Sequence, residues 1–124
     1  MKTLAECQKE VKEFDIERNW DYFYPLELFA NLNEEIGEIW QRIAWVSEEK
    51  KKVLINKYHQ EIEDNIGDLL FLIFKLSNQL NVDCHKGFRN VMEEYYSRFP
   101  LEQFQNKDKD SNTANKDLGY DDKV

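Results

Sequence analysis

The chain has 124 residues, which is the size of one domain with a single hydrophobic core. Its 25 acidic residues outnumber its 17 Lys and Arg, for a formal net charge of -8. Such a charge repels phosphate backbones and anionic headgroups, so neither a nucleic-acid polymer nor a membrane surface is expected as a partner. With 41% hydrophobic and 14% aromatic residues, most of the chain is expected to fold.

The N-terminal residues contain no apolar run behind the first lysine, so they do not resemble a secretory signal. We therefore expect a cytoplasmic protein. The longest apolar run covers residues 69–74 and is far shorter than a membrane-spanning helix. The two cysteines, Cys7 and Cys84, are interpreted as reduced packing residues.

Glycine and proline are scarce, and no alternating run of β-branched residues indicates a strand, so the predicted class is all-α. A first amphipathic helix is expected over residues 3–17, with Thr3 as its N-cap. A second helix is expected over residues 25–45, because Pro25 suits the first turn of a helix. Both helices carry apolar residues at steps of three and four.

A third helix is expected to begin after Ser47 and to be strongest over residues 61–80. A fourth is predicted over residues 84–98, with Asp83 as its N-cap. Four helices fit an antiparallel four-helix bundle, which would occupy residues 1–104 as one domain. Residues 105–124 are polar and lack periodicity, so they are interpreted as a flexible C-terminal tail.

Two helices carry stripes of oxygen-bearing side chains. The second helix has Glu34, Glu35 and Glu38, and the third has Glu61, Asp64, Asn65 and Asp68. If these helices pack antiparallel with the stripes facing, the carboxylates repel one another unless a cation lies between them. Mg²⁺ prefers such oxygen ligands and shares its other positions with phosphates.

Two other interpretations of these acids stay open. An acidic run in an acidic chain is often a solvated helix face. Asp68 has apolar neighbours in sequence and is expected to need a partner, which could be Arg42 or Lys75 instead of a metal.

Four segments together resemble the MazG-like superfamily of all-α nucleoside triphosphate pyrophosphatases, which includes dCTP pyrophosphatases and dimeric dUTPases. They are FDIERNWDYFYP, LFANLNEEIGEIW, IEDNIGDLLFLIFKLSNQLNVD and YYSRFP. The resemblance implies a hydrolase that converts nucleoside triphosphates to monophosphates and pyrophosphate and sanitises the nucleotide pool. It also implies a homodimer or homotetramer, and the apolar run at residues 69–74 exceeds what one bundle face needs.

The resemblance also implies roles for individual residues. The catalytic acids would be Glu34, Glu35 and Glu38. Magnesium, or manganese, would be held by Glu35, Glu38, Asp68, Asp64 and Asn65. The substrate would be bound by Trp20, Phe23, Tyr24, Trp45 and Arg98. Water activated by the metal and a neighbouring carboxylate would attack the α-phosphorus.

The sequence departs from the family pattern at two places. Asn65 stands where the family has a glutamate, which removes one negative charge from the metal site. Met92, Glu93 and Glu94 stand near positions where many relatives carry a lysine and often an asparagine. Two hypotheses follow: an active pyrophosphatase, or a catalytically impaired MazG-like protein that binds nucleotide or a protein partner. A third hypothesis, an acidic helical protein without a nucleotide role, predicts that neither nucleotide nor a divalent metal binds.

The base preference is left open by the sequence. The likeness of the segment around residues 14–25 to dCTP pyrophosphatases gives a mild preference for a pyrimidine deoxynucleotide.

Overall fold

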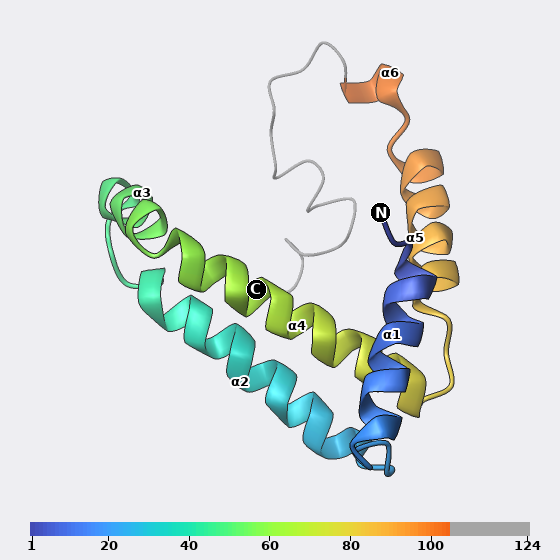
Figure 1. Cartoon of the computed structure of the whole chain (residues 1–124). Coiled ribbons are helices and arrows are strands. Elements are labelled where there is room, and N and C mark those ends of the chain that lie inside the picture. The colour runs from blue at the N-terminus through green and yellow to red at the C-terminus, as the bar shows by residue number, and fades with distance from the viewer. Residues whose placement is uncertain (105–124) are drawn as a thin grey trace. The chain divides into compact units, whose positions relative to one another are not determined.

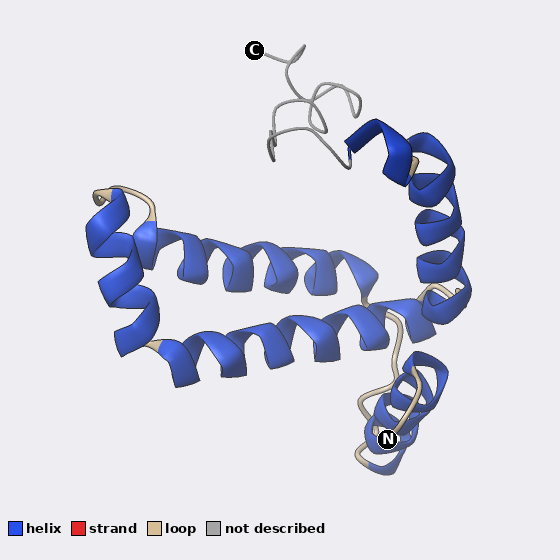
Figure 2. Ribbon diagram, turned by 90° about the horizontal axis from the view of Figure 1, so that it is seen from above, coloured by secondary structure: helices blue, strands red, loops and turns tan. Residues whose placement is uncertain are grey.

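The computed structural model describes residues 1–104, and every regular element in that range is a helix. The helices are α1 (Leu4–Glu17), α2 (Pro25–Ile43), α3 (Glu48–Lys57), α4 (His59–Gln79), α5 (Cys84–Arg98) and α6 (Leu101–Phe104). The all-α prediction is thus confirmed over the described residues (Figure 2). The chain divides into two compact units, Met1–Cys84 and His85–Val124, and each is described by itself.

The N-terminus of α1 has the cap that the sequence predicts. Thr3 accepts a hydrogen bond from the backbone N–H of Glu6, and the Glu6 carboxylate accepts one from the backbone N–H of Thr3. This capping box satisfies two backbone donors that the helix cannot. The reciprocal bond lowers the pKa of Glu6.

In the first unit, α2 and α4 lie side by side and run in opposite directions, as Figure 1 shows. The helix α3 lies at one end of this pair and contacts both of them, while α1 packs against α4. The helix α2 begins at the predicted Pro25 and ends at Ile43, two residues before the predicted end. The antiparallel pairing puts the acidic faces of α2 and α4 within reach of each other.

The predicted third helix is two helices, α3 and α4, which is a correction. Ser47 caps α3 as expected, because its hydroxyl accepts from the backbone N–H of Lys50. Tyr58 then leaves the helical conformation, with φ -104° and ψ 25°. Its ring lies 5.5 Å from the guanidinium carbon of Arg42 on α2, a cation–π distance. This tertiary contact accompanies the bend, and no Gly or Pro at residues 57–59 announces it in the sequence.

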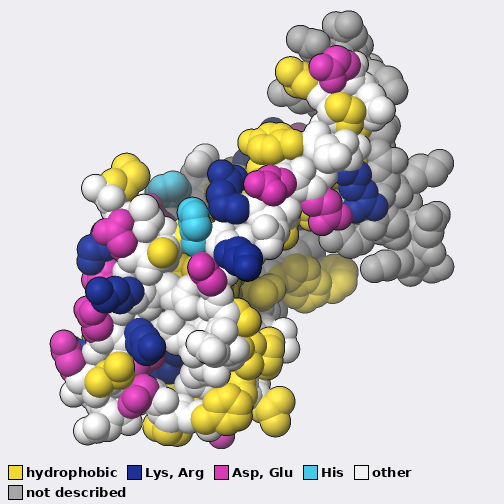
Figure 3. Space-filling model, turned by 90° about the vertical axis from the view of Figure 1, so that its right-hand side faces the viewer, with side chains coloured by type: hydrophobic (Ala, Val, Ile, Leu, Met, Phe, Trp, Pro, Cys, Tyr) yellow, Lys and Arg dark blue, Asp and Glu magenta, His cyan; other side chains and the backbone are white. Residues whose placement is uncertain are grey.

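The hydrophobic core of the described residues is thin. Only two apolar side chains, Leu28 and Phe74, are buried. Large apolar side chains remain exposed along both long helices of the first unit: Leu26, Phe29, Ile36, Trp40, Ile66, Leu70 and Ile73. Hydrophobic side chains are visible at several places on the surface in Figure 3.

The second unit contains most of α5 and all of α6 among its described residues. Phe99 links the two helices, because its ring meets the rings of Tyr95 and Phe104, each at 5.9 Å between centroids. The tail predicted for residues 105–124 lies outside the described residues, and the single-domain limits stay a prediction. Within residues 1–104, no helix has the length and apolar character that crossing a membrane requires.

The four-helix bundle also stays a prediction, since α5 belongs mostly to the second unit.

Candidate active site

A depression of about 260 Å³ lies between α2 and α4 and is lined mainly by oxygen-bearing side chains. Its residues are Asn31, Glu34 and Glu35 from α2, and Asp68, Phe71 and Leu72 from α4. On α2, residues 31, 34 and 35 share one helix face because they are three or four apart. The antiparallel packing of α4 places Asp68 opposite that face.

Like charges crowd around Glu35 in this depression. Its pKa is raised above the ordinary glutamate value, first because the carboxylate is partly desolvated and then because Glu38, Asp68 and Glu34 repel its charge. A carboxylate in this setting favours either a proton or a cation. The three predicted acids of α2 and Asp68 of α4 therefore form one electrostatic cluster.

The sequence interpretation of Asp68 as a buried carboxylate is wrong. Asp68 is exposed, since it lies at the open depression between α2 and α4. Neither proposed alternative partner pairs with it in the described part of the chain: Lys75 pairs with Asp15, and Arg42 lies against Tyr58. Asp68 therefore lies at the depression without either of the two partners that the sequence suggested.

The other predicted metal ligands are placed less directly. Glu38 lines a neighbouring depression of about 440 Å³ together with Asn33, Glu34, Gly37 and Gln41, so Glu34 belongs to both. Asp64 is exposed on α4 and lines neither.

Asn65 is half-buried, and its side-chain Nδ2 is buried without a hydrogen-bond partner among the described residues. A 180° rotation of the amide would bring its Oδ1, a cation ligand, to the same position.

The oxygen-bearing side chains of the depression suit a hard cation, but they do not form a complete binding site as they lie. Asn31, Glu34, Glu35 and Asp68 offer only carboxylate and amide groups, whose oxygens Mg²⁺ prefers. Within residues 1–104, no three Asp, Glu, His or Cys side chains converge closely enough to hold a metal as they stand. The residues fit the chemistry of Mg²⁺ with few protein ligands and the rest supplied by water and phosphate.

The predicted substrate aromatics fall into two groups. Trp20 and Tyr24 lie near α4, with ring centroids 5.8 and 5.0 Å from the Lys75 ammonium. Phe23 is exposed. Trp45 is also exposed and packs edge-on against Trp40 at 5.3 Å, at the end of α2. The remaining predicted residue, Arg98, belongs to the second unit. Its Nη1 lies 3.7 Å from Oε1 of Glu94.

The structure reveals a charged pair that the sequence interpretation did not assign to the site. Asp15 of α1 and Lys75 of α4 form an ion pair at 3.5 Å between Oδ1 and Nζ, with side chains only 5% and 7% exposed. Both line a cavity of about 120 Å³. The one signal in the sequence is Lys75 itself, a single charge within an apolar stretch of α4, seven residues after Asp68.

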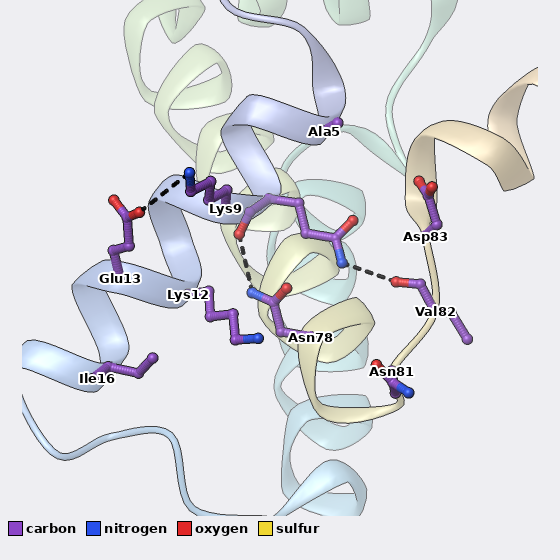
Figure 4. A pocket seen from close by; sticks show the side chains of 10 residues that line it. Ala5, Lys9, Lys12, Glu13, Ile16, Asn78, Asn81, Val82 and Asp83 are labelled. Atoms are coloured by element: carbon purple, nitrogen blue, oxygen red, sulfur yellow. Dashed lines mark hydrogen bonds and ion pairs between the residues drawn. The ribbon is translucent and has the colours of Figure 1, made fainter.

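Hydrogen bonds from α4 hold the neighbouring segments in place. The Gln79 amide accepts from the backbone N–H of Tyr24 and donates to the carbonyl of Tyr22, both at 2.9 Å. The Asn78 amide donates to the carbonyl of Gln8, whose own amide donates to the carbonyl of Val82 (Figure 4). These bonds fix α1 and the aromatic segment against the C-terminal half of α4.

Comparison with known proteins identifies the family. Residues 23–101 match the sequence profile of the MazG nucleotide pyrophosphohydrolase domain. The chain belongs to the MazG family. The match covers α2 to α5, and hence both acidic faces of the depression.

Two curated proteins are similar to the chain in sequence. The chain is 31% identical over 97 residues to the uncharacterized protein YpjD of Bacillus subtilis, covering 78% of this chain and 86% of that protein. It is 38% identical over 64 residues to the nucleoside triphosphate pyrophosphohydrolase/pyrophosphatase MazG of Thermotoga maritima. That alignment covers 51% of this chain and only 25% of the Thermotoga protein. No solved structure matches the chain.

Proposed function

We propose that this chain is a Mg²⁺-dependent nucleoside triphosphate pyrophosphohydrolase that releases nucleoside monophosphate and pyrophosphate and sanitises the nucleotide pool. The observation that carries the proposal is the acidic depression between α2 and α4, in which Glu34, Glu35 and Asp68 meet. Family membership supports the same reaction class. A cluster of like charges at a surface depression is costly without a cation, and a triphosphate needs the same cation for charge neutralisation.

In this proposal Glu35, Glu38 and Asp68 hold Mg²⁺ or Mn²⁺, with Asp64 and the Oδ1 of Asn65 as further oxygen ligands. When bound, the ion would offset the charge that develops on the triphosphate and on the leaving pyrophosphate. The raised pKa of Glu35 reflects crowding that a bound cation would relieve, because the cation favours the charged carboxylate. A neighbouring carboxylate that does not hold the ion, such as Glu34, would accept the proton from the attacking water.

Other side chains would bind the rest of the nucleotide. Glu34 supports the catalytic acids, and the Asn31 amide can donate to a phosphate oxygen at the same depression. We assign the base side to Trp20, Phe23, Tyr24 and Trp45, and a phosphate contact to Arg98.

A homodimer or homotetramer is part of the proposal. Two buried apolar side chains are few for a domain of this size, while Phe29, Ile36, Leu70 and Ile73 are each more than 40% exposed. Exposed apolar surface of this extent is typical of an interface. Light scattering coupled to size exclusion should give two or four times the mass of one chain, and a monomer at micromolar concentration would contradict this part.

The test of the reaction is a product assay. Purified protein is incubated with Mg²⁺ or Mn²⁺ and a panel of ribo- and deoxynucleoside triphosphates, and mono-, di- and triphosphates are separated by ion exchange. Monophosphate and pyrophosphate should form with the wild type and fall by about 10²-fold or more with Glu38→Gln. Glu27→Gln, on the same helix but away from both depressions, is the matched control and should keep full activity.

A catalytically impaired, nucleotide- or protein-binding protein is the second candidate. It is favoured by Asn65 in place of the family's glutamate and by the absence of a converged metal cluster within residues 1–104. It predicts no turnover by wild type or Glu38→Gln, with nucleotide binding retained. Appearance of activity in Asn65→Glu alone would then identify the lost ligand as the cause.

A further inference from the structure

The cavity beside the Asp15–Lys75 pair is a built polar site distinct from the acidic depression. It is lined by Lys12, Asp15, Ile16, Asp21, Lys75, Asn78 and Gln79 and measures about 120 Å³. The side chains of Asp15 and Lys75 are 95% and 93% buried. Burying two charges is costly before their mutual attraction is counted. A further hydrogen-bonding partner in the cavity would therefore stabilise the pair.

One side-chain oxygen of Asp15 lacks a hydrogen bond from the described residues. This oxygen, Oδ1, is buried. The 3.5 Å ion pair to Lys75 is longer than an ordinary charge-assisted hydrogen bond. Burial raises the pKa of Asp15 more than the neighbouring Lys75 ammonium lowers it. The carboxylate oxygen is therefore available to accept a hydrogen bond from a ligand.

The pair offers an acceptor and a donor next to each other. Asp15 accepts hydrogen bonds and Lys75 donates them. Hydrogen bonds from two adjacent atoms on the edge of a heterocycle diverge slightly, and the 3.5 Å between Asp15 Oδ1 and Lys75 Nζ suits such a pair of atoms. The rings of Trp20, Tyr24 and Phe71 surround the Lys75 ammonium at 5.8, 5.0 and 5.9 Å. These rings confine the ammonium beside the cavity, although they do not line it.

The cavity is placed to serve the proposed active site. Phe71 lines the acidic depression and also lies 5.9 Å from the Lys75 ammonium, so it separates the two. Asp68 and Lys75 are seven residues apart on α4, which is two helical turns or about 10 Å. A nucleotide with its phosphates at Asp68 could therefore extend its base past Phe71.

The size of the cavity restricts the base. The cavity of about 120 Å³ is small, so it accommodates one six-membered ring better than a fused pair. We propose that the Asp15–Lys75 pair reads the hydrogen-bonding edge of a pyrimidine base, with Asp15 accepting from the base and Lys75 donating to it. This assignment rests on the proposed function for its substrate, but its test does not require turnover.

The experiment is an NMR titration of the full chain with cytidine, uridine, adenosine and guanosine, without phosphate or metal. In the wild type, the pyrimidine nucleosides should shift the Trp20 indole N–H signal and bind more tightly than the purines. The double variant Asp15→Leu/Lys75→Met removes both charges together, so no unpaired buried ion is left. It should bind pyrimidines at least about tenfold more weakly, while the control Lys9→Gln, on the exposed face of α1, should stay within twofold of the wild type.

Purine nucleosides binding as well as pyrimidines to the wild type, or unchanged pyrimidine affinity in a folded double variant, would overturn the inference. If the double variant does not fold, Asp15→Asn provides the test, because it keeps the size of the side chain and reduces its accepting power. Its ratio of pyrimidine to purine affinity should fall by about tenfold, and an unchanged ratio would overturn the inference.

The two proposals fail separately. Selective pyrimidine binding without hydrolysis would reject the proposed reaction and support the edge-reading pair. Hydrolysis whose base preference is the same in the wild type and the folded double variant would support the reaction and reject the pair.

Discussion

Two charged clusters lie two helical turns apart along α4, and they differ in net charge and in burial. Around Asp68, like charges from α2 and α4 meet at an exposed depression. Around Lys75, opposite charges from α1 and α4 meet inside the molecule. None of the four acids of the first cluster has an ion-pair partner among residues 1–104, whereas the second cluster combines both signs and leaves Asp15 Oδ1 without a hydrogen bond there. Carboxylates beside the same helix therefore meet different conditions, because the first cluster is open to solvent and Asp15 is buried against Lys75.

The largest expected effect comes from breaking the buried pair. Lys75→Met leaves Asp15 as an uncompensated buried charge and should lower the free energy of unfolding by about 3–5 kcal/mol. The double variant Asp15→Leu/Lys75→Met should recover most of that loss. Urea denaturation at neutral pH measures all three proteins, and equal destabilisation by the single and double variants would argue against the pair as the cause.

The exposed cluster should respond to metal instead. Mg²⁺ at ten times its dissociation constant should stabilise the wild type by about 1.4 kcal/mol, seen as a rise in the thermal unfolding midpoint. Glu35→Gln combined with Asp68→Asn should abolish most of that rise, because two ligands lose their charge. The variant Glu27→Gln controls for the loss of a negative charge on α2. If Mg²⁺ raised the unfolding midpoint equally in the wild type, the double variant and Glu27→Gln, the metal would bind elsewhere.

A smaller change is expected when the family's missing acid is restored. Asn65→Glu adds a fifth negative charge to the cluster of four acids and should tighten Mg²⁺ binding by up to about tenfold. Isothermal titration with Mg²⁺ measures the change, and the matched Asp64→Asn shows whether the neighbouring exposed acid contributes. Unchanged binding in Asn65→Glu would mean that the side chain at position 65 does not reach the metal.

The smallest effect is a pH dependence at Glu35. Its pKa is raised in the folded protein above the ordinary value of 4.5, so the native state holds this proton more tightly than the unfolded chain. The stability that the protonated Glu35 contributes is fully present below its pKa in the unfolded chain. It is lost as the pH rises through its pKa in the folded protein. In metal-free buffer the wild type should lose a few tenths of a kcal/mol relative to Glu35→Gln between about pH 4 and 7. Calorimetry across this range measures the difference, and a relative gain would reverse the assigned shift.

The helix boundaries that depend on local chemistry could be predicted from the sequence. Thr3, Ser47 and Pro25 mark the starts of α1, α3 and α2 because caps and N-terminal prolines act within one turn. The bend at Tyr58 could not be predicted, because no Gly or Pro marks residues 57–59, and the Tyr58 ring lies near both the adjacent Lys57 and Arg42 of α2. The spacing of apolar residues within one helix does not reveal its contacts with other helices.

The candidate site divides in the same way. Helical spacing suffices to put Glu34 and Glu35 on one face of α2, and the residue types suffice to suggest a hard cation. The exposure of Asp68 could not be predicted, because its apolar sequence neighbours point to other faces of α4. The pairing of Lys75 with Asp15, 60 residues away in sequence, depends on how α1 packs against α4.

Gln79 accepts a hydrogen bond from the backbone N–H of Tyr24 and donates one to the carbonyl of Tyr22, so both bonds involve peptide groups. They do not depend on which side chains residues 22–24 carry. Substitutions at these aromatic positions should therefore leave the main chain of the segment in place. The attachment of the segment to α4 and the choice of its side chains can thus vary independently in the sequence.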